Sequence, residues 1–331
     1  MILATSFITL GVIYGVWYSY SVFLVALVRE FGWSRSLVSG AFAFFSLIHG
    51  GLGPPVGWLL RRVGPRRVIL AGVGVMAVGL ILTAQTTVWW HLYLAFGVVT
   101  ALGISLNGWI PVVVLIQGWF PDRMGSAMGL ASAGIGVGIF AFVPLSQVLI
   151  DWCGWRWTFG ILAAVTVAWG LPSAFWLIQD PPAFSMGSSK PGGSRRSEVS
   201  GVCWTIGTAV KSWRFWGLAG VYFMGNFVTQ MLMIHYVYAG LNAFGYGVLS
   251  PVFPAIASDL FRGPGFSTIY GSLYTAICIG LAAGPWAAGQ IFDLTGSYSM
   301  ALWLGLVMAV VSPALLWIVG PRRPNPPPLK G

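Results

Sequence analysis

The residues of this sequence that could do chemistry are uncharged polar side chains placed along apolar segments. In three places they recur at helical spacing, so that each set shares one face of a helix. The sets are Tyr14, Tyr18 and Ser21; Tyr222, Asn226 and Gln230; and Tyr270 with Tyr274, while Asn107 and His49 stand apart from them. Hydroxyl and amide groups can hydrogen-bond a polar solute. No set contains paired carboxylates or a nucleophile beside a base, so we expect a binding or transport role and no enzyme.

The segments that carry these side chains are long, apolar and free of charge. Hydrophobic residues make up 57% of the chain and charged residues 7%, whereas soluble domains have about 25% charged residues. The 17 Lys and Arg and the 7 Asp and Glu all lie in gaps between apolar segments or at the ends of those segments. A charge at the centre of a bilayer costs about 2.5–3.5 kcal/mol even on lenient scales. The composition predicts an all-α polytopic membrane protein. The +10 net charge then reflects the topology of the chain in the membrane and not nucleic-acid binding.

Ten segments are long enough to cross a bilayer, for which about 20 apolar residues suffice. They lie at 2–27, 36–60, 67–85, 92–118, 124–149, 157–178, 213–237, 241–261, 265–292 and 298–320. An even number of spans places both termini on one side, and only Arg29, Arg35 and Arg156 then fall on the opposite side. By the positive-inside rule both termini are cytoplasmic. We expect an integral protein of a bacterial cytoplasmic (inner) membrane.

The charged and flexible composition of residues 179–211 divides the chain. These residues are rich in Pro, Gly and Ser and predict a cytoplasmic linker, whose last part, 204–211, would lie as a short amphipathic helix at the interface. The linker separates a six-helix bundle, residues 1–178, from a shortened four-helix bundle with a short cytoplasmic tail, residues 212–331.

An internal repeat crosses this linker. Gly129 and Asp151 are as far apart in the sequence as Gly271 and Asp293, and both segments are glycine-rich. Two halves related by such a repeat are typical of secondary transporters. The preferred interpretation of the glycine runs is close packing between helices. The second interpretation is that they are deformable segments that let the two halves rock against each other. The 3 cysteines are scattered without disulfide or metal spacing, so no cofactor is expected.

The loop between the second and third predicted spans carries a specific resemblance. It resembles the signature loop of the major facilitator superfamily, G-x-L-x-D-R-x-G-x-R-R, and the matching residues are Gly57, Leu59, Arg62, Gly64, Arg66 and Arg67. Arg61 stands where the pattern has an aspartate, which in the family latches the two bundles together, and an arginine cannot take that acidic part. A second reading of Arg66 and Arg67 is that they only set the topology.

Three further segments narrow the resemblance. Residues 31–36, 119–129 (which include Arg123) and 284–298 resemble the monocarboxylate-porter and oxalate/formate-antiporter branch. The resemblance implies alternating access and a small organic acid as substrate, with a coupled proton or counter-anion. It also implies twelve spans, but here the seventh span runs directly into a segment, 242–254, that resembles the family's tenth.

The apparent absence of the family's eighth and ninth spans has a consequence for function. In the branch, one arginine that binds the substrate carboxylate comes from the eighth span, and another cation comes from the eleventh, where residues 265–292 contain no Lys or Arg. The leading hypothesis is a carrier of monocarboxylate-like acids. The alternative is a transport-deficient bundle that acts only through association with another chain.

The resemblance places the cavity of such carriers between spans 1, 4, 7 and 11. We therefore predict that the substrate pathway includes Tyr14, Tyr18, Asn107, Asn226, Gln230 and Tyr274. Two other interpretations stay open, namely hydrogen bonds between helices worth about 0.6 kcal/mol and, for the tyrosines, an aromatic belt at the membrane surface. For His49 a packed neutral histidine is preferred over a proton site.

Overall fold

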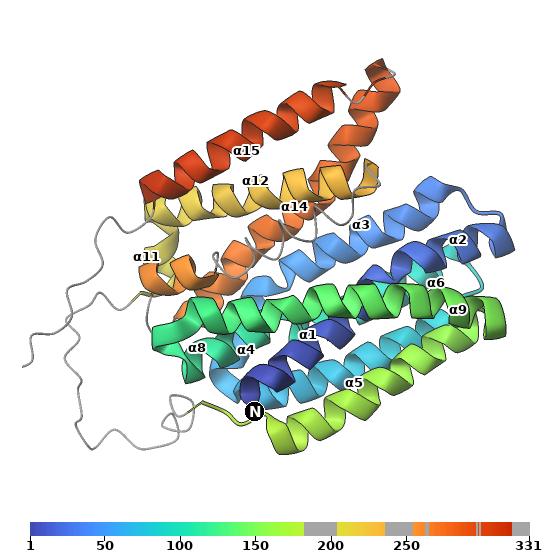
Figure 1. Ribbon diagram of the computed structural model, residues 1–331, viewed down its shortest axis with the longest axis horizontal. Coiled ribbons are helices and arrows are strands. Elements are labelled where there is room, and N and C mark those ends of the chain that lie inside the picture. The colour runs from blue at the N-terminus through green and yellow to red at the C-terminus, as the bar shows by residue number, and fades with distance from the viewer. Residues whose placement is uncertain (182–203, 236–253, 262–264, 296, 298, 320–331) are drawn as a thin grey trace, which may run out of the picture.

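The computed structural model describes residues 1–181, 204–235, 254–261, 265–295, 297 and 299–319, and Figure 1 shows their arrangement. Within these ranges the regular secondary structure is entirely helical. Long helices lie roughly along one direction and pack through apolar faces. The predicted all-α polytopic fold is confirmed.

The first span is a nearly continuous helix made of α1 (Ile2–Tyr18) and α2 (Tyr20–Phe31). They meet at Ser19, whose hydroxyl donates to the carbonyl of Gly15 at 2.8 Å. Ser21 is exposed and donates to the carbonyl of Tyr18, so it does not share the burial of Tyr14 although it lies at the predicted helical spacing from it.

The second span is bent. Helix α3 (Arg35–Gly51) begins at Ser34, whose hydroxyl accepts a bond from the Leu37 amide, and α4 (Gly53–Val63) continues at an angle of 45°. Two prolines directly follow the junction, and proline removes the amide hydrogen bonds that would keep the helix straight. Helix α4 ends at Gly64, whose φ of 87° suits glycine, and α5 (Pro65–Ala84) follows at once.

The fourth span is irregular at its centre. It consists of α6 (Trp89–Leu92), the π-helix η1 (Tyr93–Thr100), α7 (Ala101–Asn107) and α8 (Trp109–Trp119). Gly108 interrupts the helix between α7 and α8. After a 3₁₀ turn, η2 (Pro121–Arg123), helix α9 (Met124–Pro172) folds back at Gly154, where φ is 80°, and ends in η3 (Ser173–Leu177). Its two arms correspond to the predicted spans 124–149 and 157–178.

The C-terminal part contains fewer described helices. They are α11 (Ile206–Val210), α12 (Trp213–His235), a helical stretch at 254–260, α14 (Phe266–Thr295) and α15 (Ser299–Val319). Helix α11 falls within the predicted short helix at 204–211, and Thr205 with Thr208 forms a capping box at its start. Most of the predicted span 241–261 and most of the linker lie outside the described residues.

Six helices of the described part are long and apolar enough to cross a membrane, and the bent pair α3–α4 makes a seventh. One of the six is the 57-residue segment from Pro121 to Leu177, which the turn at Gly154 divides into two arms. Helix α12 adds a 23-residue segment packed on α14 and α15. The total of ten spans stays a prediction.

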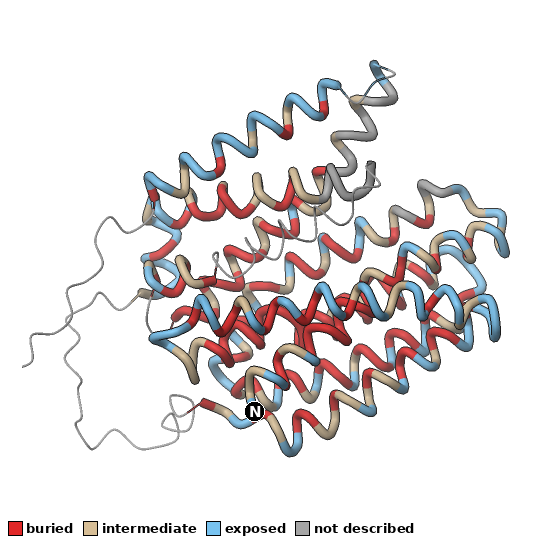
Figure 2. The backbone as a smooth tube through the Cα atoms, viewed as in Figure 1, coloured by how far each residue is buried: buried red, intermediate tan, exposed pale blue. Residues whose placement is uncertain are grey.

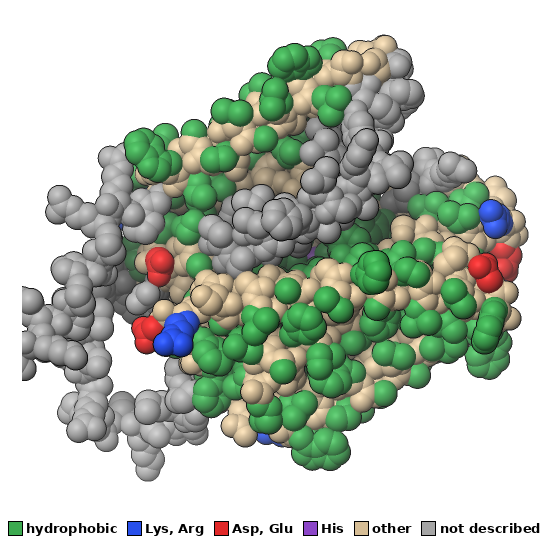
Figure 3. All heavy atoms as spheres, viewed as in Figure 1, with side chains coloured by type: hydrophobic (Ala, Val, Ile, Leu, Met, Phe, Trp, Pro, Cys, Tyr) green, Lys and Arg blue, Asp and Glu red, His purple; other side chains and the backbone are tan. Residues whose placement is uncertain are grey.

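Burial and charge follow the pattern of a membrane protein. Figure 2 shows buried residues where helices face one another and exposed residues on their outer sides. Large apolar side chains are among the exposed ones, such as Phe140, Trp152 and Trp317 at 84%, 85% and 80% exposure. In Figure 3 the charged side chains lie near the two ends of the helices, with a mostly hydrophobic surface between them. That surface suits contact with lipid chains.

Candidate functional site

A buried polar cluster joins the N-terminal helices (α1 to η3) to α14. Nε2 of His49 lies 3.2 Å from the hydroxyl of Tyr274, which in turn lies 3.2 Å from the hydroxyl of Tyr14. Nδ1 of His49 lies 2.6 Å from the hydroxyl of Ser105 in α7. These four side chains are at most 4% exposed. We refer to Tyr14, His49, Ser105 and Tyr274 as the His49 cluster.

The hydrogen-bond directions in this cluster follow from its acceptors. The hydroxyl of Ser105 donates its one hydrogen to the carbonyl of Ala101 at 2.7 Å, so it accepts from Nδ1–H of His49. A neutral imidazole with its hydrogen on Nδ1 has a bare Nε2 that accepts. Tyr274 therefore donates to His49 and accepts from Tyr14. In this arrangement both ring nitrogens of neutral His49 are hydrogen-bonded.

Aromatic rings surround the cluster on the side of α1 and α3. The Trp17 ring stacks on Tyr14 with centroids 5.2 Å apart and meets the His49 ring edge-on at 5.0 Å. Phe45 stacks on His49 from one helical turn away, at 5.9 Å. Nε1 of Trp17 is buried and has no hydrogen-bond partner within the part of the chain that the structure describes. A buried donor without an acceptor is costly, which marks this position as incomplete.

Small residues bring α3 and α4 into direct backbone contact with α14. A Cβ atom added to Gly53 would overlap the carbonyl of Gly271, and one added to Gly271 would overlap the carbonyl of Gly53. Next to this contact, Ser267 donates to the Gly57 carbonyl at 2.8 Å and Thr275 donates to the Gly50 carbonyl at 2.7 Å. We call this surface the α4–α14 contact. Beyond it, α14 runs away from α3 toward Thr295 (Figure 1).

Two further polar bonds join α8 to the C-terminal part. Nε1 of Trp109 donates to the Tyr270 hydroxyl at 2.7 Å, and Nε2 of Gln117 donates to the Ser258 hydroxyl at 3.2 Å. Trp109 is the first residue after the interruption at Gly108. Tyr270 and Tyr274, predicted to share one face of α14, thus both contact the N-terminal helices.

The structure brings some predicted pathway residues together and leaves others apart. Tyr14 and Tyr274 meet in the His49 cluster, and Tyr18 lies one turn away, half-buried, with the Trp17 ring 5.9 Å from its own. Exposure along this side of the first span increases from Tyr14 through Tyr18 to Ser21.

The amide residues lie elsewhere. Asn107 packs within the N-terminal helices, where its Nδ2 approaches Sδ of Met76 at 3.8 Å. Its Oδ1 is buried and has no hydrogen-bond partner among the described residues. Asn226 is 6% exposed and donates to the Tyr222 carbonyl of its own helix. Gln230 belongs to α12, but its side chain lies outside the described residues. A pathway role for these three stays a prediction.

The signature loop has a structural function within the N-terminal helices. The Arg66 side chain donates to the carbonyls of Ala174 and Phe175 at 2.9 and 2.7 Å, and so caps the end of the sixth span. Its amide donates to Asp180, whose carboxylate also lies against Gly64. Arg66 therefore does more than set the topology.

The other arginines of the loop are more exposed to solvent than Arg66. Arg62 lies 4.1 Å above the Trp58 ring, which is a cation–π arrangement. Arg61, Arg67 and, beyond the loop, Arg123 are exposed. Because Arg61 replaces the aspartate of the pattern, this exposed position carries a positive charge instead of a negative one.

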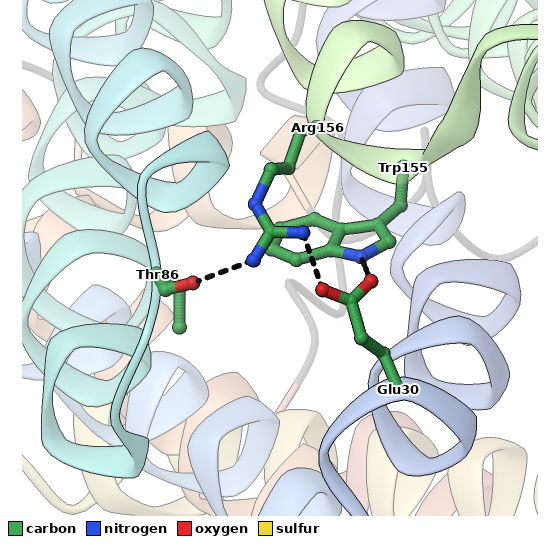
Figure 4. A network of polar contacts seen from close by, with 4 residues as sticks. All are labelled: Glu30, Thr86, Trp155 and Arg156. Carbon is green, nitrogen blue, oxygen red and sulfur yellow. Dashed lines mark hydrogen bonds and ion pairs between the residues drawn. The ribbon is translucent and has the colours of Figure 1, made fainter.

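Charged contacts at the opposite end hold that end of the N-terminal helices together (Figure 4). Glu30, from α2, forms an ion pair with Arg156 and accepts a bond from Nε1 of Trp155. Arg156 also donates to the Thr86 carbonyl at 3.4 Å and lies 4.2 Å above the Trp155 ring. This network links the first, third and sixth predicted spans.

Sequence reasoning missed three members of the site, which are Trp17, Ser105 and Trp109. For one of them the sequence contains a signal, because Ser105 lies at helical spacing, four residues before Trp109, which follows the break at Gly108. Trp17 was overlooked because its ring is apolar. Among the described residues no group of three His, Cys, Asp or Glu could hold a metal ion.

Comparison with known proteins gives the chain its family. A model described as "Major Facilitator Superfamily" matches residues 6–242. Monocarboxylate transporter 13 of Rattus norvegicus is 32% identical over 50% of this chain, monocarboxylate transporter 4 of Gallus gallus 31% over 56%, and monocarboxylate transporter 3 of Rattus norvegicus 35% over 47%. These alignments cover 39%, 39% and 32% of the relatives, so the chain spans well under half of their length. The chain belongs to the major facilitator superfamily, whose members are membrane carriers and not enzymes.

Proposed function

We propose that this protein is a secondary carrier of small monocarboxylates that works by alternating access. Superfamily membership and the names of the similar transporters support this substrate class. In such a carrier residues 1–178 and 212–331 would act as the two rocking units, joined by the linker 179–211. Both termini would be cytoplasmic, and a proton or a counter-anion would be the coupled ion.

The observation that carries the proposal is the nature of the α4–α14 contact. The N-terminal helices meet α14 through glycine backbone and hydrogen bonds beside buried apolar side chains, and the contact extends from Gly50 to Gly57, the residue at which the signature loop begins. Contacts between membrane helices are typically built from such small residues and hydrogen bonds. With the signature loop on the cytoplasmic side, the described arrangement corresponds to a carrier that is closed toward the cytoplasm.

The alternative function keeps one specific observation in its favour. The apolar stretches of the sequence contain no Lys or Arg, although a carboxylate in a membrane interior needs a positive partner. A transport-deficient bundle that associates with another chain would need no such positive partner.

The membrane that holds the protein is a separate question. The similar transporters are animal proteins and give no support to a bacterial inner membrane.

Uptake by purified protein in liposomes tests the carrier function. We expect saturable accumulation of at least one radiolabelled acid from a panel of lactate, pyruvate, acetate and oxalate. Replacing both Asn226 and Gln230 with Ala should abolish it if they line the pathway. Thr166→Val is the control, since Thr166 is buried and donates to its own helix at Leu162. Uptake equal to that of empty liposomes for every acid would contradict the carrier function and favour the alternative.

A further inference from the structure

The His49 cluster contains the imidazole that lies in the interior of the described helices. The chain has 3 histidines. His49 is 1% exposed, whereas His91 lies in the short helix α6 and is only half-buried. The His235 side chain lies outside the described residues. Histidine is the side chain that takes up and releases protons near neutral pH, so this position can hold a proton where the apolar stretches offer no carboxylate.

The free electron pair that would receive the proton is on Nε2. The bond from Nδ1–H to Ser105 leaves Nε2 as the acceptor of the Tyr274 hydroxyl hydrogen. When a proton binds, Nε2 becomes an N–H donor, and the Tyr274 hydroxyl must turn its hydrogen away. The proton that enters forms one new N–H bond and breaks no covalent bond of the protein.

The described groups around His49 supply no fixed charge of either sign. Tyr14 from α1 and Tyr274 and Cys278 from α14 face it or its neighbour Gly50, and Ser105 comes from α7. The hydroxyls of Tyr20 (α2) and Tyr93 (η1) donate to the carbonyls of Val38 and Leu37. Arg61 and Arg62 of α4 are exposed. An imidazolium here is stable only with an anion that arrives together with the proton.

A second hydrogen-bond donor lies beside the imidazole. Nε1–H of Trp17 is buried and unpartnered within the described part of the chain, and its ring is in edge contact with His49. An indole N–H can only donate, so its missing partner must be an acceptor such as a carboxylate oxygen. A carboxylate has two oxygens and can accept from two donors at once.

We propose that His49 takes up the transported proton and that its imidazolium, together with Nε1–H of Trp17, binds the carboxylate of a small monocarboxylic acid. The proton and the anion load as a neutral pair among described interior residues that carry no fixed charge. On release, Nε2 returns its proton to water and the carboxylate leaves. This inference rests on the carrier function and assigns its substrate site and its coupled ion.

The site also links loading to the contact between the two parts of the chain. Tyr274 belongs to α14, and its bond to Nε2 is one of those that hold α14 against α3. Protonation of Nε2 removes the acceptor of that bond. Loading therefore weakens the His49–Tyr274 connection at the moment when the acid binds.

Gradient-driven uptake separates a proton site from a packed histidine. With a more acidic outside solution, wild-type liposomes should accumulate the acid. The variant His49→Gln should lose this accumulation, because glutamine keeps donor and acceptor groups but cannot hold the proton. His91→Gln is the control and should accumulate like wild type. Full gradient-driven accumulation by folded His49→Gln protein would overturn the inference while leaving the carrier function standing.

A direct measurement covers the cases in which the protein does not transport or the variant does not fold. Wild-type protein labelled with ¹⁵N-histidine, in nanodiscs at constant pH, is titrated with sodium propionate and, separately, sodium chloride. We expect propionate alone to convert one histidine from the Nδ1–H form to the doubly protonated form, and Trp17→Phe should shift this change to higher propionate concentration. Histidine signals that are the same with both salts would overturn the inference.

Discussion

Two glycine-lined contacts in this molecule differ in what accompanies the glycines. Between α1 and the first arm of α9, a Cβ atom added to Gly134 or Gly138 would overlap the carbonyls of Phe7 and Gly11. Between α4 and α14, Gly53 and Gly271 meet in the same way. The sequence pattern of small residues is alike in both places, yet one contact lies inside the N-terminal helices and the other joins them to α14.

The polar groups distinguish the two contacts. Around the α4–α14 contact, hydroxyls of α14 donate to backbone carbonyls, and the His49 cluster lies beside it. Around Gly134 and Gly138 the nearest atoms of α1 are backbone atoms, and one hydroxyl bond, from Ser146 to Ser19 at 3.0 Å, joins this arm of α9 to the first span farther along. Polar groups that become separated can bond to water or to a solute, whereas tightly packed backbone has no such replacement. Close packing alone therefore does not tell a permanent contact from a separable one.

The largest expected effect comes from crowding the contact between α1 and α9. Gly138→Leu should prevent folding or destabilise the protein by about 3 kcal/mol or more, the upper range for overpacked interiors. The measurement is the monodisperse fraction in detergent together with the thermal unfolding midpoint. Gly136→Leu is the matched control, since that glycine is two residues away, exposed and without neighbours within 4 Å. Equal losses in both variants would contradict the assignment of a permanent contact.

A smaller effect of a different kind is expected at the α4–α14 contact. Gly53→Ala should leave the protein folded but part α4 from α14, and overpacking of about 1–3 kcal/mol corresponds to a population shift of about 5- to 150-fold. Cys278 is buried against Gly50 and reports the parting by its rate of maleimide labelling, in protein with Cys153 and Cys203 changed to Ser.

Gly51→Ala is the control for this experiment, because Gly51 is exposed and has nothing within 4 Å of an added Cβ atom. If Gly53→Ala lowers the folded yield as strongly as Gly138→Leu, the two contacts are equally permanent and the comparison fails.

The smallest effect is expected from single hydroxyls. Thr275→Val removes the bond to the Gly50 carbonyl, and hydrogen bonds between membrane helices are worth about 0.6 kcal/mol on average. Cys278 labelling should therefore accelerate less than in Gly53→Ala. Ser272→Ala is the control, because Ser272 donates within its own helix to Thr268 at 3.0 Å. A larger effect of Thr275→Val than of Gly53→Ala would show that hydrogen bonds, and not glycine packing, dominate the contact.

Much of the fold could be predicted because hydropathy and charge are local properties. The ranges 36–60 and 265–292 correspond closely to α3–α4 and α14. The exposure of Ser21 was not predicted, because it depends on which helices pack beside the first span and not on spacing along that span. Of the candidate site, Tyr14 and Tyr274 were found as polar residues, but nothing local indicated that they are bonded to each other.

The sequence by itself determined that this is a membrane protein with charge-free helices, because each long apolar segment must cross a bilayer whatever its neighbours are. Only the tertiary structure decided which polar faces meet. That Tyr274 lies against His49, and that Nε1 of Trp17 has no partner among the described residues, depends on how α1, α3 and α14 rotate and pack. Residues so far apart in the chain share no local signal. The charge-free interior was readable from composition, whereas the position of His49 inside the described helices became visible only in the packed structure.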